Sequence, residues 1–282
     1  MKLLLERVVD INRNRKGNSN MKYGCFGFSN QLTDIEAAGF DSAELDFCEL
    51  TDMTNLEFTN FYKKASSSKL NFEVFSGLLP LTERFHSSSF HLDYWLEHTA
   101  RGAKRAKELG CVMIPFGAGK CRSIPDDIDP EEGKATVASI VRSFSELLQE
   151  YDIKLIVEPL GTPNSNYLNT LAETNEFLKK VQHPNCSAMC DLRHMHKSNE
   201  AFSEIVKYRS IVKHAHIDYP RKLTRYFPSP EDDFDYLPYF QALSDANYQG
   251  LLTVEATAVK QNFLQEASIC CEYLKKLENS VN

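Results

Sequence analysis

The sequence has no long hydrophobic run, and its apolar stretches fall short of the roughly 18 residues that a membrane-spanning helix requires. It also has no surplus of positive charge, because 32 Lys and Arg residues stand against 39 Asp and Glu residues and the formal net charge is -7. A protein that binds nucleic acid needs a basic surface to neutralise phosphates. These deficits argue against a membrane and a nucleic-acid partner, while a local basic pocket for one small anionic substrate stays open.

Cysteine is present eight times, but no two cysteines form a CxxC pair. Several lie inside apolar runs, where Cys behaves as a small hydrophobe, so we expect reduced thiols. The first 20 residues join a short apolar stretch to a polar, basic one, and no small-residue cleavage site follows. Together these features predict a reducing, cytoplasmic location.

Two phosphate-binding loops are also missing, since the sequence contains neither GxGxxG nor GxxxxGK[ST]. Their absence argues against an open doubly wound sheet built around a nucleotide. A length of 282 residues, with 42% hydrophobic and 25% charged residues, is typical of one globular domain. We predict a loosely ordered N-terminal extension over residues 1–20 and one folded domain over residues 21–282.

From residue 21 onward, short β-prone runs alternate with stretches whose apolar residues recur three and four apart, as in Leu96, Ala100 and Ala103. This alternation is typical of βα units and a parallel sheet. The β-prone runs cover residues 23–28, 42–45, 71–75, 112–116, 154–158, 187–190, 212–217 and 251–254. Eight such units close most naturally into a barrel, so we predict an α/β fold with a single (β/α)8 TIM barrel.

Metal-competent side chains stand where each of the last four predicted strands ends. They are Glu158, Asp191, His216 and Glu255, separated from one another by about one βα unit each. Functional groups of a (β/α)8 barrel lie at the C-terminal ends of its strands, so these four should converge. Three carboxylates and one imidazole suit one divalent metal ion such as Mn²⁺, Mg²⁺, Co²⁺ or Fe²⁺, with Zn²⁺ also open.

Each of these residues has a simpler explanation when it is taken alone. A carboxylate at a strand end is often a helix N-cap or a salt-bridge partner, and a strand histidine is often a core residue. Four such coincidences on four consecutive strands are harder to assign to chance. We therefore favour a shared metal site over four independent structural roles.

The segments that follow these strands resemble a known family. They read FGAGKCRSIP after the fourth strand, IVEPLGTPNSNYLNT at the fifth, CDLRHMH at the sixth, HAHID at the seventh and NYQGLLTVE at the eighth. In order and spacing they resemble the xylose isomerase-like barrels of the sugar phosphate isomerase/epimerase group, which includes the ketose 3-epimerases. The resemblance runs from about Met21 to the end of the chain.

The resemblance implies a role for each matching residue. Glu158, Asp191, His216 and Glu255 would ligate the metal, and His194 would contact a substrate oxygen. In the epimerases of the family, the positions matching Glu158 and Glu255 also exchange the substrate proton. This division is chemically sensible, because two carboxylates on opposite faces can remove and return a proton next to a carbonyl that a metal polarises.

Further substrate-binding candidates are cationic. Arg122 follows FGAGKC and could present its guanidinium to substrate, although a solvated loop cation is an equal alternative. Family epimerases often place a substrate-binding arginine six residues after the metal histidine, where this chain has Lys222, with Arg221 one residue earlier. An ammonium cannot reproduce the bidentate contacts of a guanidinium, so this departure leaves the substrate open.

Other positions near the predicted mouth are open to two interpretations. His214 lies two residues before His216 on the same strand and could support the ligands from behind. Ser76 stands where close relatives often carry Asn. The aromatic rings of Phe26 and Phe28 could line a sugar pocket, although core packing is the simpler explanation.

The leading hypothesis is a metal-dependent isomerase or epimerase of a small sugar, sugar phosphate or related keto-polyol, acting by carboxylate-mediated proton transfer through an enediolate. A metal-dependent lyase or dehydratase is the alternative. An apurinic endonuclease fits poorly, because the chain is acidic and only four of its eight histidines lie near the predicted mouth. A non-catalytic sugar-binding barrel stays possible, and self-association is expected only because family members are often dimers or tetramers.

Overall fold

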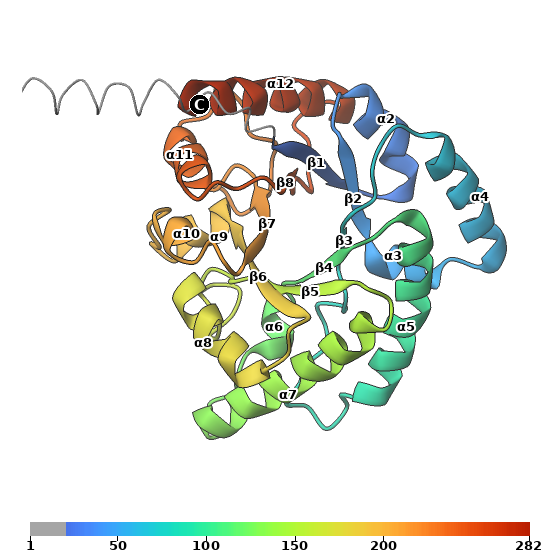
Figure 1. The fold of residues 1–282 in the computed structure, drawn as a ribbon, viewed down its shortest axis with the longest axis vertical. Helices are drawn as coiled ribbons and strands as arrows, with labels where there is room; N and C mark the ends of the chain where they lie inside the picture. Colours follow the sequence, from blue (N-terminus) through green and yellow to red (C-terminus); the bar gives the residue numbers. More distant parts are fainter. Residues whose placement is uncertain (1–20) are drawn as a thin grey trace, which may run out of the picture.

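A computed structural model describes residues 21–282 of the chain. Within these residues, eight parallel strands surround a central axis and the helices form a ring outside them, as Figure 1 shows. The strand order is β3-β2-β1-β8-β7-β6-β5-β4, so strands adjacent in sequence are neighbours in the sheet, except for β3 and β4, which form its two edges. The predicted single TIM barrel is confirmed, whereas the extension predicted for residues 1–20 lies outside the described part of the chain.

The strands occur where the β-prone runs predicted them. They are β1 (Lys22–Gly27), β2 (Ser42–Asp46), β3 (Phe75–Ser76), β4 (Met113–Phe116), β5 (Lys154–Val157), β6 (Cys186–Asp191), β7 (Val212–Ile217) and β8 (Leu251–Val254). The bounds of β7 and β8 agree with the prediction, and most others differ by one residue. The β3 strand is the exception.

The β3 strand covers two residues, where the sequence predicted five. Asn71 instead forms an isolated bridge with Ser42, and Val74 forms one with Met113. The carbonyl oxygen of Glu73 also accepts hydrogen bonds from the amides of Val112 and Met113. These bonds join the β3 and β4 edges, so the barrel is nearly closed although the ladder there is short.

The helices alternate with the strands. They are the 3-10 helix η1 (Ser29–Gln31) and the α-helices α2 (Leu32–Ala37), α3 (Phe47–Asp52), α4 (Asn55–Ser67), α5 (Leu92–Leu109), α6 (Gly119–Arg122), α7 (Pro130–Gln149), α8 (Leu171–Val181), α9 (Leu192–Lys197), α10 (Glu204–Lys207), α11 (Leu237–Asp245) and α12 (Phe263–Val281). No helix among residues 21–282 is both long and apolar enough to cross a membrane.

Local signals fix where several of these helices begin and end. The side chain of Asp129 accepts hydrogen bonds from two backbone amides at the start of α7, and Pro130 occupies its first position, where a missing amide proton costs nothing. Gly110 ends α5 in the left-handed conformation, with φ 101°, which glycine adopts without a steric penalty.

The register of the late strands brings their ends together. Asp191, the last residue of β6, is paired with His216 on β7, and Ile217 is paired with Val254, the last residue of β8. The strands are parallel, so their carboxyl ends open at one mouth of the barrel. Polar side chains at these ends can meet there, above a core of buried apolar strand residues.

Candidate metal centre and substrate site

Four side chains from four neighbouring strands meet at this mouth. Glu158 directly follows β5, Asp191 ends β6, His216 is the penultimate residue of β7, and Glu255 directly follows β8. One ligand atom from each lies within 4.8 Å of all the others. The first three residues are buried and Glu255 is partly exposed, so solvent reaches the cluster from the side of β8.

The Nδ1 atom of His216 lies at the centre of this cluster. It is 3.2 Å from Glu255 Oε2, 3.7 Å from Glu158 Oε1 and 3.9 Å from Asp191 Oδ2. Nδ1 and Glu158 Oε1 are both buried without a hydrogen-bond partner in the described part of the chain. Unpartnered buried polar atoms are costly, and a divalent cation bound among these oxygens would use both atoms, so the residues fit such an ion.

The opposite ring nitrogen of His216 faces the barrel interior. Its Nε2 atom is 3.0 Å from Oε1 of Glu44, a fully buried carboxylate on β2, and Nε2 of His214 is 2.9 Å from the other carboxylate oxygen. Burial opposes charge on both partners, but the attraction between Glu44 and the two histidines holds the pKa of Glu44 well below its usual range. The sequence did not single out Glu44.

His194 lies one turn beyond Asp191, because Asp191 caps α9 by accepting a hydrogen bond from the His194 amide at 2.9 Å. The backbone amide of Gly161 donates to His194 Nδ1 at 3.1 Å. The other ring nitrogen, Nε2, is 3.7 Å from Glu158 Oε1. Burial lowers the pKa of His194, which favours the neutral ring.

Arg225 is the cationic side chain that reaches the cluster. Its Nη1 atom is 2.5 Å from Glu255 Oε2 and 3.5 Å from Asp191 Oδ2, and its Nη2 atom is 3.0 Å from His194 Nε2. Burial opposes its charge, but the carboxylates outweigh burial and raise the pKa of Arg225. The sequence analysis missed this residue, which lies nine positions after His216 instead of six.

A buried ion pair supports Arg225 from below. Asp218 Oδ2 is 3.2 Å from Arg225 Nη1 and 2.7 Å from the Nε atom of Arg193, which is also buried. The Arg193 guanidinium donates further to the backbone carbonyls of Tyr219, Lys222 and Thr224. These bonds hold the turn after β7 in the path that carries Arg225 to the mouth.

The three cationic residues that the sequence suggested for substrate binding, Arg122, Arg221 and Lys222, do not lie among the clustered carboxylates as Arg225 does. Arg122 is fully buried, and its guanidinium donates to four backbone carbonyls, those of Phe116, Gly117, Tyr167 and Leu168. All three of its nitrogens are engaged in this way, so Arg122 joins two loops of the mouth.

Arg221 and Lys222 lie on the exposed part of the turn after β7. Arg221 pairs with Asp233 at 2.9 Å, while Lys222 offers its backbone carbonyl to Arg193. Within residues 21–282, no hydrogen bond or ion pair joins either side chain to the four clustered residues. The turn directs Arg225 towards the cluster, while the substrate contacts expected of Arg122, Arg221 and Lys222 stay a prediction.

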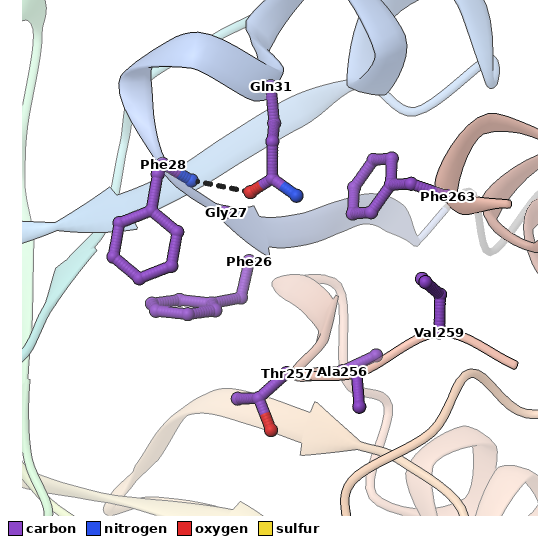
Figure 2. A pocket seen from close by; sticks show the side chains of 9 residues that line it. Phe26, Gly27, Phe28, Gln31, Ala256, Thr257, Val259 and Phe263 are labelled. Atoms are coloured by element: carbon purple, nitrogen blue, oxygen red, sulfur yellow. Dashed lines mark hydrogen bonds between the residues drawn. The ribbon is translucent and has the colours of Figure 1, made fainter.

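A cavity of about 160 Å³ opens between the C-terminal ends of β1 and β8. Figure 2 shows the rings of Phe26, Phe28 and Phe263 around it, with Ala256 and Thr257 on the opposite side. Ala256 follows Glu255 directly, so one wall of the cavity comes from the segment that carries Glu255. Phe26 and Phe28 therefore line a cavity at the mouth.

Comparison with known proteins gives one family and several similar structures. The family model described as "Xylose isomerase-like TIM barrel" matches residues 32–276. A protein described as a probable ketose 3-epimerase from Synechocystis sp. is 29% identical over 176 residues, which is 58% of this chain and 58% of the relative.

Two solved structures illustrate the likeness in fold. D-psicose 3-epimerase from Clostridium cellulolyticum H10 superposes with a TM-score of 0.78 at 16% identity, over 92% of this chain and 99% of that chain. The 3-keto-D-glucoside 4-epimerase of E. coli superposes with a TM-score of 0.76 at 19% identity, over 91% of this chain and 100% of that chain. At these identities the likeness concerns the fold alone.

Proposed function

Because the chain belongs to the xylose isomerase-like TIM barrel family, we propose that it is a metal-dependent isomerase or epimerase of a small sugar, a sugar phosphate or a related keto-polyol. One observation carries the proposal: ligand atoms of Glu158, Asp191, His216 and Glu255 lie within 4.8 Å of one another at the mouth of the barrel. The partial match to a probable ketose 3-epimerase supports the reaction class.

In this proposal the four clustered residues hold one divalent ion, which could be Mn²⁺, Mg²⁺, Co²⁺, Fe²⁺ or Zn²⁺. Their oxygen-rich donor set suits hard cations, and no cysteine is among the clustered donors. When bound, such an ion would polarise the substrate carbonyl and acidify the neighbouring C–H bond.

Glu158 and Glu255 perform the proton transfer. They follow β5 and β8, three strands apart around the barrel, so they approach a bound substrate from different sides. One carboxylate takes the proton from the carbon next to the carbonyl, and the electron pair of the broken C–H bond forms an enediolate. The other carboxylate protonates the same carbon from its opposite face, and the product is the epimer.

His194 and Arg225 stabilise the negative oxygen of the enediolate. His194 Nε2 and Arg225 Nη2 are 3.0 Å apart. A substrate oxygen between them would accept a hydrogen bond from Arg225, and from His194 when its ring carries a proton on Nε2, and these bonds are worth most when the oxygen becomes negative. Arg225 therefore replaces Arg221 and Lys222 as the cation that we assign to substrate.

The apolar cavity receives the remainder of the substrate. The rings of Phe26, Phe28 and Phe263 offer C–H and ring surfaces against which the carbon chain of a sugar can lie. Its position next to Ala256, and thus next to Glu255, fits a substrate whose reacting carbon is at the cluster.

Exchange of a substrate proton with solvent tests the mechanism. Purified protein is first analysed for bound metal, and a set of ketoses and ketose phosphates is then incubated with it in D₂O and followed by NMR. We expect deuterium to enter at one carbon next to the carbonyl. Glu158→Gln and Glu255→Gln should each slow this exchange by about 10²–10⁴-fold at saturating metal, because each removes one acid or base.

A matched control is Glu97→Gln, which removes an exposed carboxylate on α5 and should leave the exchange rate unchanged. Undiminished exchange in both mouth variants would defeat the proposed proton transfer. Mass spectrometry of the same reactions addresses the lyase alternative, because an isomerase conserves substrate mass whereas a dehydratase removes one water. The relatives described above favour an epimerase, and no finding supports the lyase.

A further inference from the structure

Glu44 has an unusual position for a carboxylate. It lies in the middle of β2, it is completely buried, and its two oxygens face His214 and His216 on β7, across the barrel interior. Ser76 on β3 donates a third, short hydrogen bond to Oε1. No Lys or Arg within residues 21–282 forms an ion pair with Glu44, so two imidazoles and one hydroxyl alone compensate its burial.

This arrangement fixes the orientation of His216. A carboxylate can only accept hydrogen bonds, so the Nε2 atom of His216 carries a proton and donates it to Glu44. The ring then presents Nδ1 to the mouth, where Glu158, Asp191 and Glu255 lie within 3.9 Å of it. Without an acceptor behind it, the ring could rotate or place its proton on Nδ1, the atom that a metal needs free.

His214 completes the support. It holds the second oxygen of Glu44 at 2.9 Å, which prevents the carboxylate from turning away from His216. The two imidazole rings stand edge to face at an interplanar angle of 82°, with centroids 4.8 Å apart, so each also restricts the other.

We propose that Glu44 is a positioning residue that makes His216 an Nδ1 metal ligand, with His214 and Ser76 holding Glu44 in place. The inference rests on the proposed metal site and concerns residues that do not touch substrate. It explains why a buried carboxylate lies among two histidines in the centre of the barrel, where an apolar group would be less costly.

A competing explanation uses the same three side chains. Glu44, His214 and His216 also lie close enough together to hold a cation of their own, with His216 bridging two ions. The distances of 2.9 and 3.0 Å between nitrogen and oxygen are those of hydrogen bonds, which favours the positioning role. The positioning role predicts one bound ion per chain, whereas the competing explanation predicts two.

The test is a calorimetric titration of chelator-treated protein with Mn²⁺. Wild-type protein should bind one ion, and Glu44→Gln should bind it about 10–100-fold more weakly, because the loss of a carboxylate behind a histidine ligand typically costs this much. Glutamine has one carbonyl oxygen for two Nε2–H donors, so one imidazole loses its acceptor. Ser76→Ala should weaken binding less than Glu44→Gln, and it keeps the proposal testable if Glu44→Gln does not fold.

A second readout reports the histidine itself. In ¹⁵N-labelled, Zn²⁺-loaded wild-type protein, the ¹⁵N shifts of His216 should show a protonated Nε2 and a metal-bound Nδ1, whereas Glu44→Gln should change this pattern. Glu49→Gln is the matched control, because Glu49 on α3 binds Ser29 and lies outside this network. It should leave both the affinity and the ¹⁵N shifts unchanged.

The possible outcomes separate this inference from the proposed function. Equal Mn²⁺ affinity and an unchanged His216 pattern in folded Glu44→Gln would overturn the positioning role alone. Two ions per chain would also overturn it, because Glu44 would then be a ligand. Failure of wild-type protein to bind Mn²⁺ or Zn²⁺ would overturn the proposed metal site itself, and the inference with it.

Discussion

In the proposed site, Arg225 would compete with the divalent cation for the same oxygens. Two of the carboxylate oxygens near its Nη1, Glu255 Oε2 and Asp191 Oδ2, also face His216 Nδ1 in the cluster. A guanidinium 2.5 Å from one of these oxygens lowers the pKa of Glu255, although burial works in the opposite direction. In the proposed site, the positive charge of Arg225 would therefore strengthen substrate binding and weaken metal binding.

Replacing Arg225 should separate these two effects. We expect Arg225→Met to bind Mn²⁺ about tenfold more tightly, because a competing positive charge worth about 1.4 kcal/mol is removed. It should also raise the KM for the ketose that shows deuterium exchange by at least about tenfold, because a charge-assisted hydrogen bond is lost. Calorimetry and initial-rate kinetics measure the two quantities.

Arg221→Met is the control, since Arg221 lies on the same turn but pairs with exposed Asp233. It should change neither the metal affinity nor KM appreciably. Weaker Mn²⁺ binding in Arg225→Met would contradict the electrostatic competition, and an unchanged KM would remove Arg225 from the substrate site.

At the scale of elements, the loop after β6 is joined to the start of α8. Glu200 lies beyond α9, and its Oε1 atom accepts a hydrogen bond from the amide of Leu171, the first residue of α8, at 2.8 Å. Its Oε2 atom is buried without a hydrogen-bond partner among residues 21–282. Burial raises the pKa of Glu200 to about 7, although the bond to Leu171 favours the charged form.

This shift predicts a pH dependence of stability with a definite sign. The ordinary pKa of a glutamate is 4.5, so between pH 4.5 and about 7 the unfolded chain loses this proton while the folded chain keeps it. The free energy of unfolding should therefore fall as the pH rises through this window and stay constant above it. After allowance for partial solvent exposure, we expect a loss of about 1–2 kcal/mol.

Glu200→Gln should remove this loss. We expect the variant to exceed wild type in urea stability by about 1 kcal/mol at pH 8 and to match it near pH 4.5. Glu150→Gln, at the exposed end of α7, serves as the control and should behave as wild type at both pH values. A variant that is less stable than wild type at pH 8 would show that the Glu200 carboxylate is stabilising there.

At the scale of the whole molecule, the last helix secures the first strand. Glu278 on α12 accepts hydrogen bonds from the backbone amide of Met21 at 3.0 Å and from the Tyr23 hydroxyl at 2.7 Å. Glu278 and Tyr23 are both buried, and about 250 residues separate them. These bonds tie the beginning and the end of the barrel together beside the β1 and β8 pairing, on which the register at the mouth depends.

Glu278→Ala should destabilise the whole barrel. It removes the acceptor of the buried Met21 amide and leaves the Tyr23 hydroxyl with its longer, 3.5 Å bond to the Leu274 carbonyl. Each loss costs roughly 1–3 kcal/mol, so we expect a loss of about 2–4 kcal/mol in the free energy of unfolding. Chemical denaturation followed by circular dichroism measures this loss as a lower midpoint with an unchanged slope. Glu272→Ala on the exposed side of the same helix should stay within about 0.5 kcal/mol of wild type. An equal loss in both variants would show that the buried hydrogen bonds of Glu278 are not responsible.

The sequence alone determined the fold and the four clustered residues. Both follow from local patterns: strands alternate with helices, and Glu158, Asp191, His216 and Glu255 stand where apolar runs end. A parallel barrel aligns its strand ends whatever its loops do, so position along a strand is enough to place these side chains at one mouth.

Only the tertiary structure decided which other residues reach that mouth. Arg225 depends on the path of a turn that Arg193 and Asp218 hold, and three basic residues in this turn look alike in sequence. Glu44 meets His216 across the barrel, although 172 residues separate them, because the closed sheet brings the inward faces of β2 and β7 together. Loop paths and contacts across the barrel depend on the packing of distant segments, which no local pattern encodes.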